Sequence, residues 1–137
     1  MPLIVWDSTY SVYLEEMDRQ HRRLIAIINR LDQAVRQGRG KDEVGQVLNE
    51  LAAYTRYHFT DEETLMTQHD HPKLENHIEE HRVFVQKIQD CHTQYLYGDP
   101  RVATEVLDFL ANWLVDHIQG SDKEYGARIA GKMAVQP

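Results

Sequence analysis

Apolar side chains recur along the chain at intervals of three and four residues, the spacing that places them on one face of an α-helix. The first stripe of this kind runs through Leu24, Ile28 and Leu31. Further stripes follow it, and together they predict four helices, at about residues 18–37, 42–66, 72–97 and 100–119. The chain shows no alternation of apolar and polar residues typical of a β-strand.

Capping residues and irregular segments mark the ends of these helices. Asp18 is predicted to be the N-cap of the first helix, and Asp99 followed by Pro100 to begin the fourth. Residues 1–17 lack a clean period and are predicted to form an ordered N-terminal arm. Residues 121–137 are predicted to form a short helical piece that fades into a frayed tail.

Short linkers join the four helices, which favours antiparallel neighbours. We therefore predict an all-α protein, a single domain over residues 1–137, built as an up-down-up-down antiparallel four-helix bundle with an ordered N-terminal arm. In such a bundle the apolar stripes face one another, so a polar residue on a stripe points into the interior.

Composition narrows the classes of function. The 137 residues have a formal net charge of −7 and no basic patch, which argues against nucleic acid and anionic membrane surfaces as partners. No apolar run approaches the roughly 20 residues that span a bilayer, so membrane insertion is not expected. The single Cys91 cannot form an internal disulfide, which suits a reducing cytoplasm, and a cytoplasmic location is expected. The unusual feature is the presence of eight histidines.

Several histidines and carboxylates stand at helical spacing on the apolar stripes. His77 and His81 are four residues apart, as are His58 and Glu62, so each pair lies on one face of its helix. Taken singly, each group also has a structural explanation, because core histidines and exposed i,i+4 pairs are common. The case for a metal site depends on whether the groups meet.

Antiparallel packing is expected to bring these groups to one level of the bundle. His21 is early in the first helix and His58 late in the second, whereas His77 is early in the third and His117 late in the fourth. All four therefore lie near the same end, which favours one shared metal site over separate structural histidines. The seven candidate metal ligands are His21, His58, Glu62, His77, His81, His117 and Asp122.

The spacing of the last two candidates makes a prediction about the backbone. Asp122 follows His117 by five residues, which on a regular α-helix would place the side chains about 140° apart. If both face one site, the backbone must loosen, and a π-bulge or bend near Gly120 is predicted. The alternative is that Asp122 is a charge beyond the helix end. His69 and His71, in the linker before the third helix, are predicted to be solvated loop residues.

The donor set limits the choice of metal. Structural zinc is satisfied by four ligands and favours Cys, whereas calcium and magnesium prefer oxygen ligands. Five imidazoles and two carboxylates are too many for one ion and fit two ions that share bridging carboxylates. Imidazole with carboxylate suits iron or manganese, and the chemistry favours a two-iron site without excluding other metals.

These motifs resemble those of the bacterial hemerythrins, in the same order and over nearly the whole chain. The matching stretches are DRQHRRL around His21, HFTDEETLM from His58, H-x-x-x-H at His77 and His81, and WLVDHIQGSDKEY from Trp113 to Tyr125. One departure is Tyr13, where the family often has Gly, and it bears on the path of the N-terminal arm and on access to the site.

The resemblance implies two iron ions in an oxo- or hydroxo-bridged centre that binds O2 reversibly. By position, one iron would be completed by His77, His81 and His117. The other would be held by His21 and His58, which leaves it a vacant position, and Glu62 and Asp122 would bridge the two. An O2 pocket would be lined by Leu24, Phe59, Trp113, Leu114 and Ile118, with plain core packing as the alternative. Outer groups that orient the imidazoles would be Gln20, Gln86 and Tyr125.

Three classes of function remain open from the sequence. The first is an O2 carrier, store or scavenger, which is not an enzyme, and we place it first. The second is an O2 or redox sensor, which would require a protein partner or a longer parent chain, because these 137 residues leave no room for an output domain. The third is a di-iron oxidase or peroxidase, which the histidine-rich ligand set disfavours because oxygen-activating bundles use carboxylate-rich sites.

Overall fold

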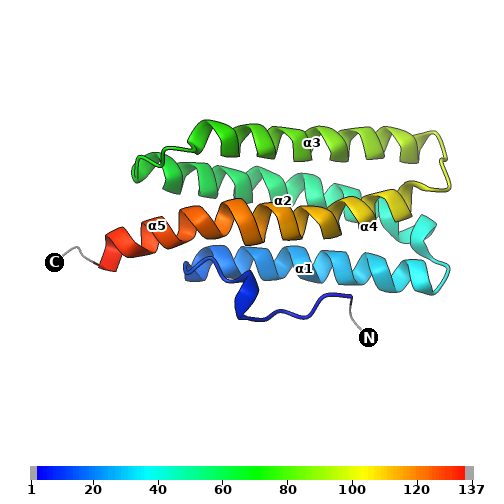
Figure 1. Cartoon of the computed structure of the whole chain (residues 1–137). Helices are drawn as coiled ribbons and strands as arrows, with labels where there is room; N and C mark the ends of the chain where they lie inside the picture. The colour runs from blue at the N-terminus through cyan, green and yellow to red at the C-terminus, as the bar shows by residue number, and fades with distance from the viewer. Residues whose placement is uncertain (1–2, 135–137) are drawn as a thin grey trace.

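The computed structural model describes residues 3–134, and within that range it contains helices and no strand. After a short 3₁₀ turn, η1 (Ser8–Tyr10), the elements are α1 (Glu15–Arg36), α2 (Gly40–Gln68), α3 (Leu74–Leu96), α4 (Val102–Trp113), η2 (Leu114–Asp122) and α5 (Lys123–Ala134). The helices run antiparallel to their sequence neighbours along one long axis (Figure 1). The predicted all-α, up-down-up-down four-helix bundle is confirmed.

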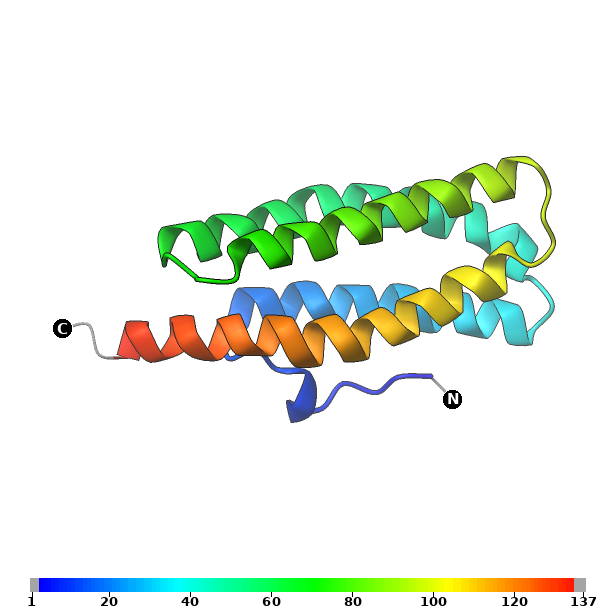
Figure 2. The same cartoon turned by 45° about the horizontal axis from the view of Figure 1, so that its top comes forward.

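The fourth position of the bundle is filled by three elements in one line. Figure 2 shows α4, η2 and α5 as a single helical rod beside α1, with α2 and α3 lying together above this pair. The apolar stripes of all four rods meet on the bundle axis, where Ile28, Leu51, Phe84 and Leu110 are almost fully buried. No described helix combines the length and apolar character needed to cross a membrane.

The first helix begins earlier than the sequence suggested. α1 starts at Glu15, with Leu14 as its N-cap, so the prediction of Asp18 as N-cap is wrong. The Asp18 carboxylate instead accepts hydrogen bonds from the Val12 amide (2.8 Å) and the Ser11 hydroxyl (2.7 Å). The side chain is therefore used to tie the N-terminal arm to the first turn of α1, where its negative charge also suits the helix dipole.

The last helices also depart from the predicted limits. α4 begins at Val102, because Asp99 and Pro100 form a turn in which the Asp99 carboxylate accepts from the Arg101 amide at 2.9 Å. The predicted end at residue 119 is wrong, since η2 and α5 continue the helix to Ala134. The buried side chains of Tyr125 and Ile129 explain this, because α5 has an apolar face of its own to pack. The outer part of the predicted frayed tail, residues 135–137, lies outside the described residues.

The N-terminal arm lies against α1, η2 and α5. The Ile4 amide donates to the Asn29 side chain at 2.9 Å, and Gln119 and Lys123 donate to Thr9. Tyr13 turns the chain from the arm into α1 and adopts φ +65°, a left-handed conformation in which glycine is favoured.

Candidate metal centre

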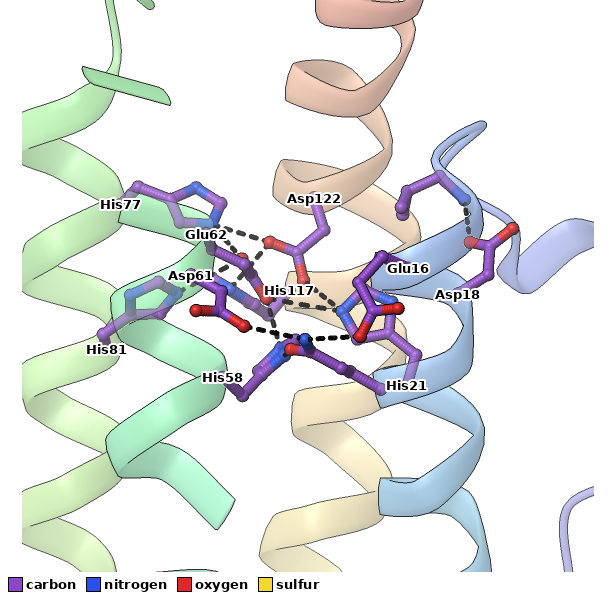
Figure 3. A network of polar contacts seen from close by, with 12 residues as sticks. Glu16, Asp18, His21, His58, Asp61, Glu62, His77, His81, His117 and Asp122 are labelled. Carbon is purple, nitrogen blue, oxygen red and sulfur yellow. Dashed lines mark hydrogen bonds and ion pairs between the residues drawn. The ribbon is translucent and has the colours of Figure 1, made fainter. Parts of the chain in front are cut away.

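All seven candidate ligands converge inside the bundle (Figure 3). The four rods of the bundle are α1, α2, α3 and the line formed by α4, η2 and α5, and every rod contributes at least one ligand. His21 comes from α1, His58 and Glu62 from α2, His77 and His81 from α3, and His117 and Asp122 from η2. Each of these residues is at most 3% exposed. They meet because the antiparallel order of the helices places their positions at the same height along the bundle, as the sequence predicted.

Glu62 lies between two groups of imidazoles and gives one oxygen to each group. Its Oε1 contacts Nε2 of His58 and lies 3.4 Å from Nε2 of His21. Its Oε2 lies 3.0 Å from Nε2 of His77 and 3.5 Å from Nε2 of His81. The carboxylate therefore spans the space between the two groups.

Asp122 divides its oxygens in the same way. Its Oδ2 lies 3.2 Å from Nε2 of His21, whereas its Oδ1 lies 2.6 Å from Nε2 of His77 and 3.0 Å from Nε2 of His117. We define the two-histidine set as His21 and His58, and the three-histidine set as His77, His81 and His117. Each set, together with both carboxylates, offers donor atoms within 4.8 Å of one another.

The widened turn of η2 makes the Asp122 contacts possible. η2 is a π-helix, in which each turn holds more residues than in an α-helix, so positions five apart return to one face. His117 and Asp122 thus point to the same place. The loosened backbone predicted from their spacing is confirmed, and the alternative of Asp122 as a charge beyond the helix end is wrong.

The buried atoms of the cluster fit a metal. Nε2 of His117, Nε2 of His81 and both oxygens of Asp122 lie close to other groups of the cluster but make no hydrogen bond of good geometry among the described residues. Buried polar atoms without partners are costly, and a cation bound by these nitrogens and oxygens would satisfy them. The donor atoms are nitrogen and oxygen only, as iron or manganese prefers.

In the absence of a metal, the cluster is held by its own charges. Burial lowers the imidazole pKa values, but contacts with Asp122 and Glu62 outweigh it and raise the pKa of His21 to about 9 and that of His77 to about 10. The pKa of His117 rises to about 9, mainly through Asp122 against the effect of burial. Burial opposes ionisation of Glu62, yet His58 and its neighbours hold the Glu62 pKa well below the usual range. Protons on the imidazoles thus occupy the role that a metal cation would take.

Three further side chains contact imidazoles from outside the cluster. Nδ1 of His58 donates to the Gln20 side-chain oxygen at 2.5 Å. Nδ1 of His81 donates to Glu63 at 2.8 Å, and Nδ1 of His117 lies 2.7 Å from a Glu80 oxygen. The sequence interpretation named Gln20 and missed Glu63 and Glu80. The available signal was adjacency, since Glu63 follows Glu62 and Glu80 precedes His81.

The other two residues expected in the outer layer behave differently from each other. The prediction for Gln86 is wrong, because Gln86 is exposed on α3 and its amide donates to Asp90. Tyr125 is fully buried with its ring centroid 5.3 Å from that of His77, edge to face, and its hydroxyl has no partner among the described residues.

Aromatic rings cover the three-histidine set. Phe59 stacks on His81 with ring centroids 3.8 Å apart, and Trp113 stacks on His117 at 4.1 Å. Leu24, Leu114 and Ile118 are buried in the apolar core of the bundle. Of the five residues expected to line an O2 pocket, Phe59 and Trp113 thus contact rings of the three-histidine set, and the pocket itself stays a prediction.

The linker histidines lie outside the cluster. The prediction that His71 is solvated is wrong, because its side chain is buried and its Nδ1 accepts a hydrogen bond from the Lys73 amide at 3.1 Å. The turn after α2 folds His71 inward, and its ring lies edge-on to Tyr125 at 6.5 Å. His69 is half-buried and is the C-cap residue of α2.

Comparison with known proteins agrees with this geometry. The model of the hemerythrin HHE cation binding domain matches residues 12–129. A bacteriohemerythrin of Stenotrophomonas maltophilia (strain R551-3) is 31% identical over 129 residues, which cover 94% of this chain and 83% of the relative. A hemerythrin-like protein of Naegleria gruberi is 33% identical over 120 residues, covering 88% of each chain.

Solved structures give the same result. A crystal structure of wild-type hemerythrin matches with a TM-score of 0.83 and 28% identity, covering 93% of this chain and 98% of the other. A crystal structure of a hemerythrin point mutant matches with a TM-score of 0.84 and 27% identity. With a domain match over most of its length and a histidine and carboxylate cluster at the expected level of the bundle, the chain belongs to the hemerythrin family.

Proposed function

We propose that this protein binds O2 reversibly at a non-haem di-iron centre, and that it stores, delivers or scavenges O2. The observation that carries the proposal is the way in which each buried carboxylate shares its two oxygens between the two sets of histidines. Glu62 and Asp122 each offer one oxygen to the two-histidine set and the other to the three-histidine set. This arrangement suits two cations bridged by both carboxylates, and membership of the hemerythrin family supports iron as the metal and O2 as the ligand.

The chain would divide the ligands unequally between the two ions. His77, His81 and His117 would hold one iron, whereas the other would have only His21 and His58 besides the shared carboxylates. With one imidazole fewer, the two-histidine side would be the place where a small ligand could bind. When bound, the iron pair supplies electrons that O2 takes up and returns on release.

The surrounding side chains would favour release of O2 over oxidation. Leu24, Leu114 and Ile118 are buried apolar residues beside the ligands in sequence, and Phe59 and Trp113 stack on imidazoles. Apolar side chains at these positions would hinder water and protons from entering the site. They would therefore protect the centre from conversion to an oxidised form that no longer binds O2.

We infer binding rather than catalysis from the composition of the cluster. Oxygen-activating di-iron bundles use carboxylate-rich sites with Glu-x-x-His motifs on two helices. This cluster contains five imidazoles and two carboxylates. The buried free thiol of Cys91 accords with a reducing compartment, and we propose a cytoplasmic location.

The decisive experiment is an optical titration with O2 of the anaerobically reduced, iron-loaded protein, followed by purging with argon. We expect a visible charge-transfer band that appears with O2 and disappears on purging. Iron content, measured on the same sample, should be two ions per chain.

Other outcomes of this titration have definite meanings. Direct, irreversible conversion to the oxidised form would contradict the carrier function and favour redox sensing with a protein partner. Sustained O2 consumption with a reducing substrate would contradict it in favour of an oxidase. A sample that binds no iron would refute the di-iron centre itself.

A further inference from the structure

The two imidazole sets differ in the charge of the groups that contact them from outside. On the three-histidine side, Nδ1 of His81 donates to the Glu63 carboxylate and Nδ1 of His117 lies against the Glu80 carboxylate, at 2.8 and 2.7 Å. Both outer groups are acidic. The Glu80 carboxylate is further fixed by the Ser121 hydroxyl, which donates to its other oxygen at 3.1 Å.

The two-histidine side has no such acidic contact. Nδ1 of His58 donates to Gln20, whose side chain is a neutral amide. Gln20 in turn donates to Asp61 at 2.9 Å and to Glu16 at 3.3 Å, so acidic groups stand one residue further out (Figure 3). Nδ1 of His21 is buried with neither a hydrogen bond nor an ion pair among the described residues, whereas Nδ1 of His117, which also makes no hydrogen bond of good geometry, lies within ion-pair distance of Glu80.

Burial makes this difference energetically important. His81 and His117 have side chains that are 3% exposed, whereas the side chains of Glu63 and Glu80 are 32% and 42% exposed. Each glutamate therefore keeps contact with solvent at the edge of the bundle while one of its oxygens reaches a buried ring. A carboxylate that accepts the outer N–H of an imidazole increases the electron density at the metal-binding nitrogen. A neutral amide does so less, and an unpartnered Nδ1 does not.

We propose that Glu63 and Glu80 are positioning residues that strengthen the three-histidine position and make it the first of the two to take a metal ion. They do so by fixing the His81 and His117 rings with Nε2 inward and by increasing the basicity of those nitrogens. The inference rests on the proposed two-metal centre but not on O2 binding. The order of metal loading is thus set by outer contacts as well as by the number of imidazoles.

The test is an anaerobic titration of the apo-protein with Co²⁺, a divalent probe whose visible bands report tetrahedral or octahedral nitrogen and oxygen ligation. The unmodified chain is expected to bind Co²⁺ in two steps, one for each set of histidines. The variant His21→Ala removes a ligand of the two-histidine set and isolates the three-histidine step. In that background, Glu63→Gln or Glu80→Gln should weaken Co²⁺ binding by about 10- to 100-fold, the usual effect of removing an outer partner of a metal ligand.

The matched control is Glu79→Gln. Glu79 is on the same helix as Glu80 and carries the same charge, but its carboxylate pairs with Arg82 and contacts no imidazole. It should leave the Co²⁺ affinity within about twofold of the parent, because exposed charges act weakly through solvent. Glu80→Asp, which keeps the charge on a shorter chain, should recover part of the affinity that Glu80→Gln loses.

Equal Co²⁺ affinities for the parent, Glu63→Gln and Glu80→Gln chains would overturn the proposal. So would an equal loss in Glu79→Gln, because the effect would then be one of net charge alone. Helical circular dichroism of each apo-variant checks that the bundle remains folded. Failure of the unmodified chain to bind Co²⁺ would instead contradict the two-metal centre, and irreversible oxidation of an iron-loaded chain would contradict only the proposed O2 function.

Discussion

At the scale of single residues, the two buried carboxylates do more than any other side chains to define the centre. Glu62 contacts four imidazoles and Asp122 contacts three, and both are fully buried. Two buried negative charges close together would be very costly if they faced only apolar groups. Cationic groups at the same place therefore favour their burial: protonated imidazoles in the metal-free protein, and metal ions in the loaded centre proposed above.

The first prediction concerns this sharing. Replacing Glu62→Ala should remove both metal ions, because the carboxylate belongs to both sets of donors. His71→Ala should keep two ions and lower only the stability of the fold, by about 1–2 kcal/mol, because a buried ring and one hydrogen bond are lost. Elemental analysis after anaerobic loading with iron checks both. Two ions in Glu62→Ala, or none in His71→Ala, would contradict the assignment of ligands.

A second residue carries strain that a substitution can relieve. Tyr13 holds φ +65° at the junction of the arm and α1, and this conformation costs a bulky residue about 1–2 kcal/mol. Tyr13→Gly should therefore raise the free energy of unfolding by about 1 kcal/mol, after allowing for the greater entropy of glycine in the unfolded chain.

The measurement for Tyr13→Gly is urea unfolding of the metal-free protein. Tyr13→Ala is its control, because alanine loses the ring but keeps the strained backbone, and it should bring no gain. A less stable Tyr13→Gly would mean that the contact of the tyrosine ring with Lys123, 5.7 Å from the ring centroid, is worth more than the strain.

At the scale of elements, the helices that carry clear apolar periods could be predicted, and their ends could not. The existence of α1, α2 and α3 follows from stripes such as Leu24, Ile28 and Leu31, which pack on the bundle axis. The start of α1 was misplaced because Asp18 has the chemistry of an N-cap but makes its hydrogen bonds to the arm. Such a contact joins an irregular segment to a helix, and the spacing of apolar residues along the chain does not reveal it.

The site itself was easier to predict than its surroundings. Spacing along each helix and the antiparallel order determine which side chains share a level, so His21, His58 and His117 could be placed together. The outer contacts of Glu63 and Glu80 depend on how far each helix is rotated about its axis, which a single sequence does not determine. The prediction for Gln86 failed for a different reason: it follows His81 by five residues, about 140° around a regular α-helix, and its amide lies on the exposed side and donates to Asp90.

The third prediction concerns how the arm holds the rod formed by η2 and α5. Gly126 lies against the carbonyl of Val12, and a Cβ at this position would overlap that backbone atom. Gly126→Ala should push the arm away and reduce stability by about 2 kcal/mol or more, as overpacking against rigid backbone does. Gly131→Ala, in the same helix and with no atom of the described residues within 4 Å of its Cβ position, should instead stabilise the fold by about 0.5–1 kcal/mol.

Thermal unfolding of the two variants gives the comparison directly. Both substitutions add one methyl group to α5. The difference between the two changes in melting temperature therefore separates the effect of the contact with the arm from that of helix propensity. Equal melting temperatures would show that the arm does not press on Gly126 in solution. A selective loss in Gly126→Ala, accompanied by weaker metal binding, would show that the arm also helps to hold Asp122 in place.

At the scale of the whole molecule, the cluster connects all four rods of the bundle at one level. α1, α2, α3 and η2 each contribute at least one candidate ligand, and the remaining length of each rod packs through apolar side chains. A bound metal pair would therefore act as a cross-link between elements that are far apart in sequence. Binding energy for such a site appears as stability of the fold, because the unfolded chain cannot assemble the ligands.

The fourth prediction follows from this coupling. The metal-free protein should remain folded and helical, because Glu62 and Asp122 are neutralised by imidazoles whose pKa values are raised to about 9 or 10. Removing iron by chelation under reducing conditions should nevertheless lower the melting temperature, by on the order of 10 °C, because ligand binding to the folded state alone contributes several kcal/mol. Differential scanning calorimetry of the loaded and chelated protein measures the shift, and reloading should restore the higher melting temperature.

Glu62→Ala serves as the control, since a chain without the shared carboxylate should melt at the same temperature with and without added iron. Equal melting temperatures for the loaded and chelated parent protein would mean that the ions do not hold the four rods together, and the seven residues would then have to be explained as an ion-paired core.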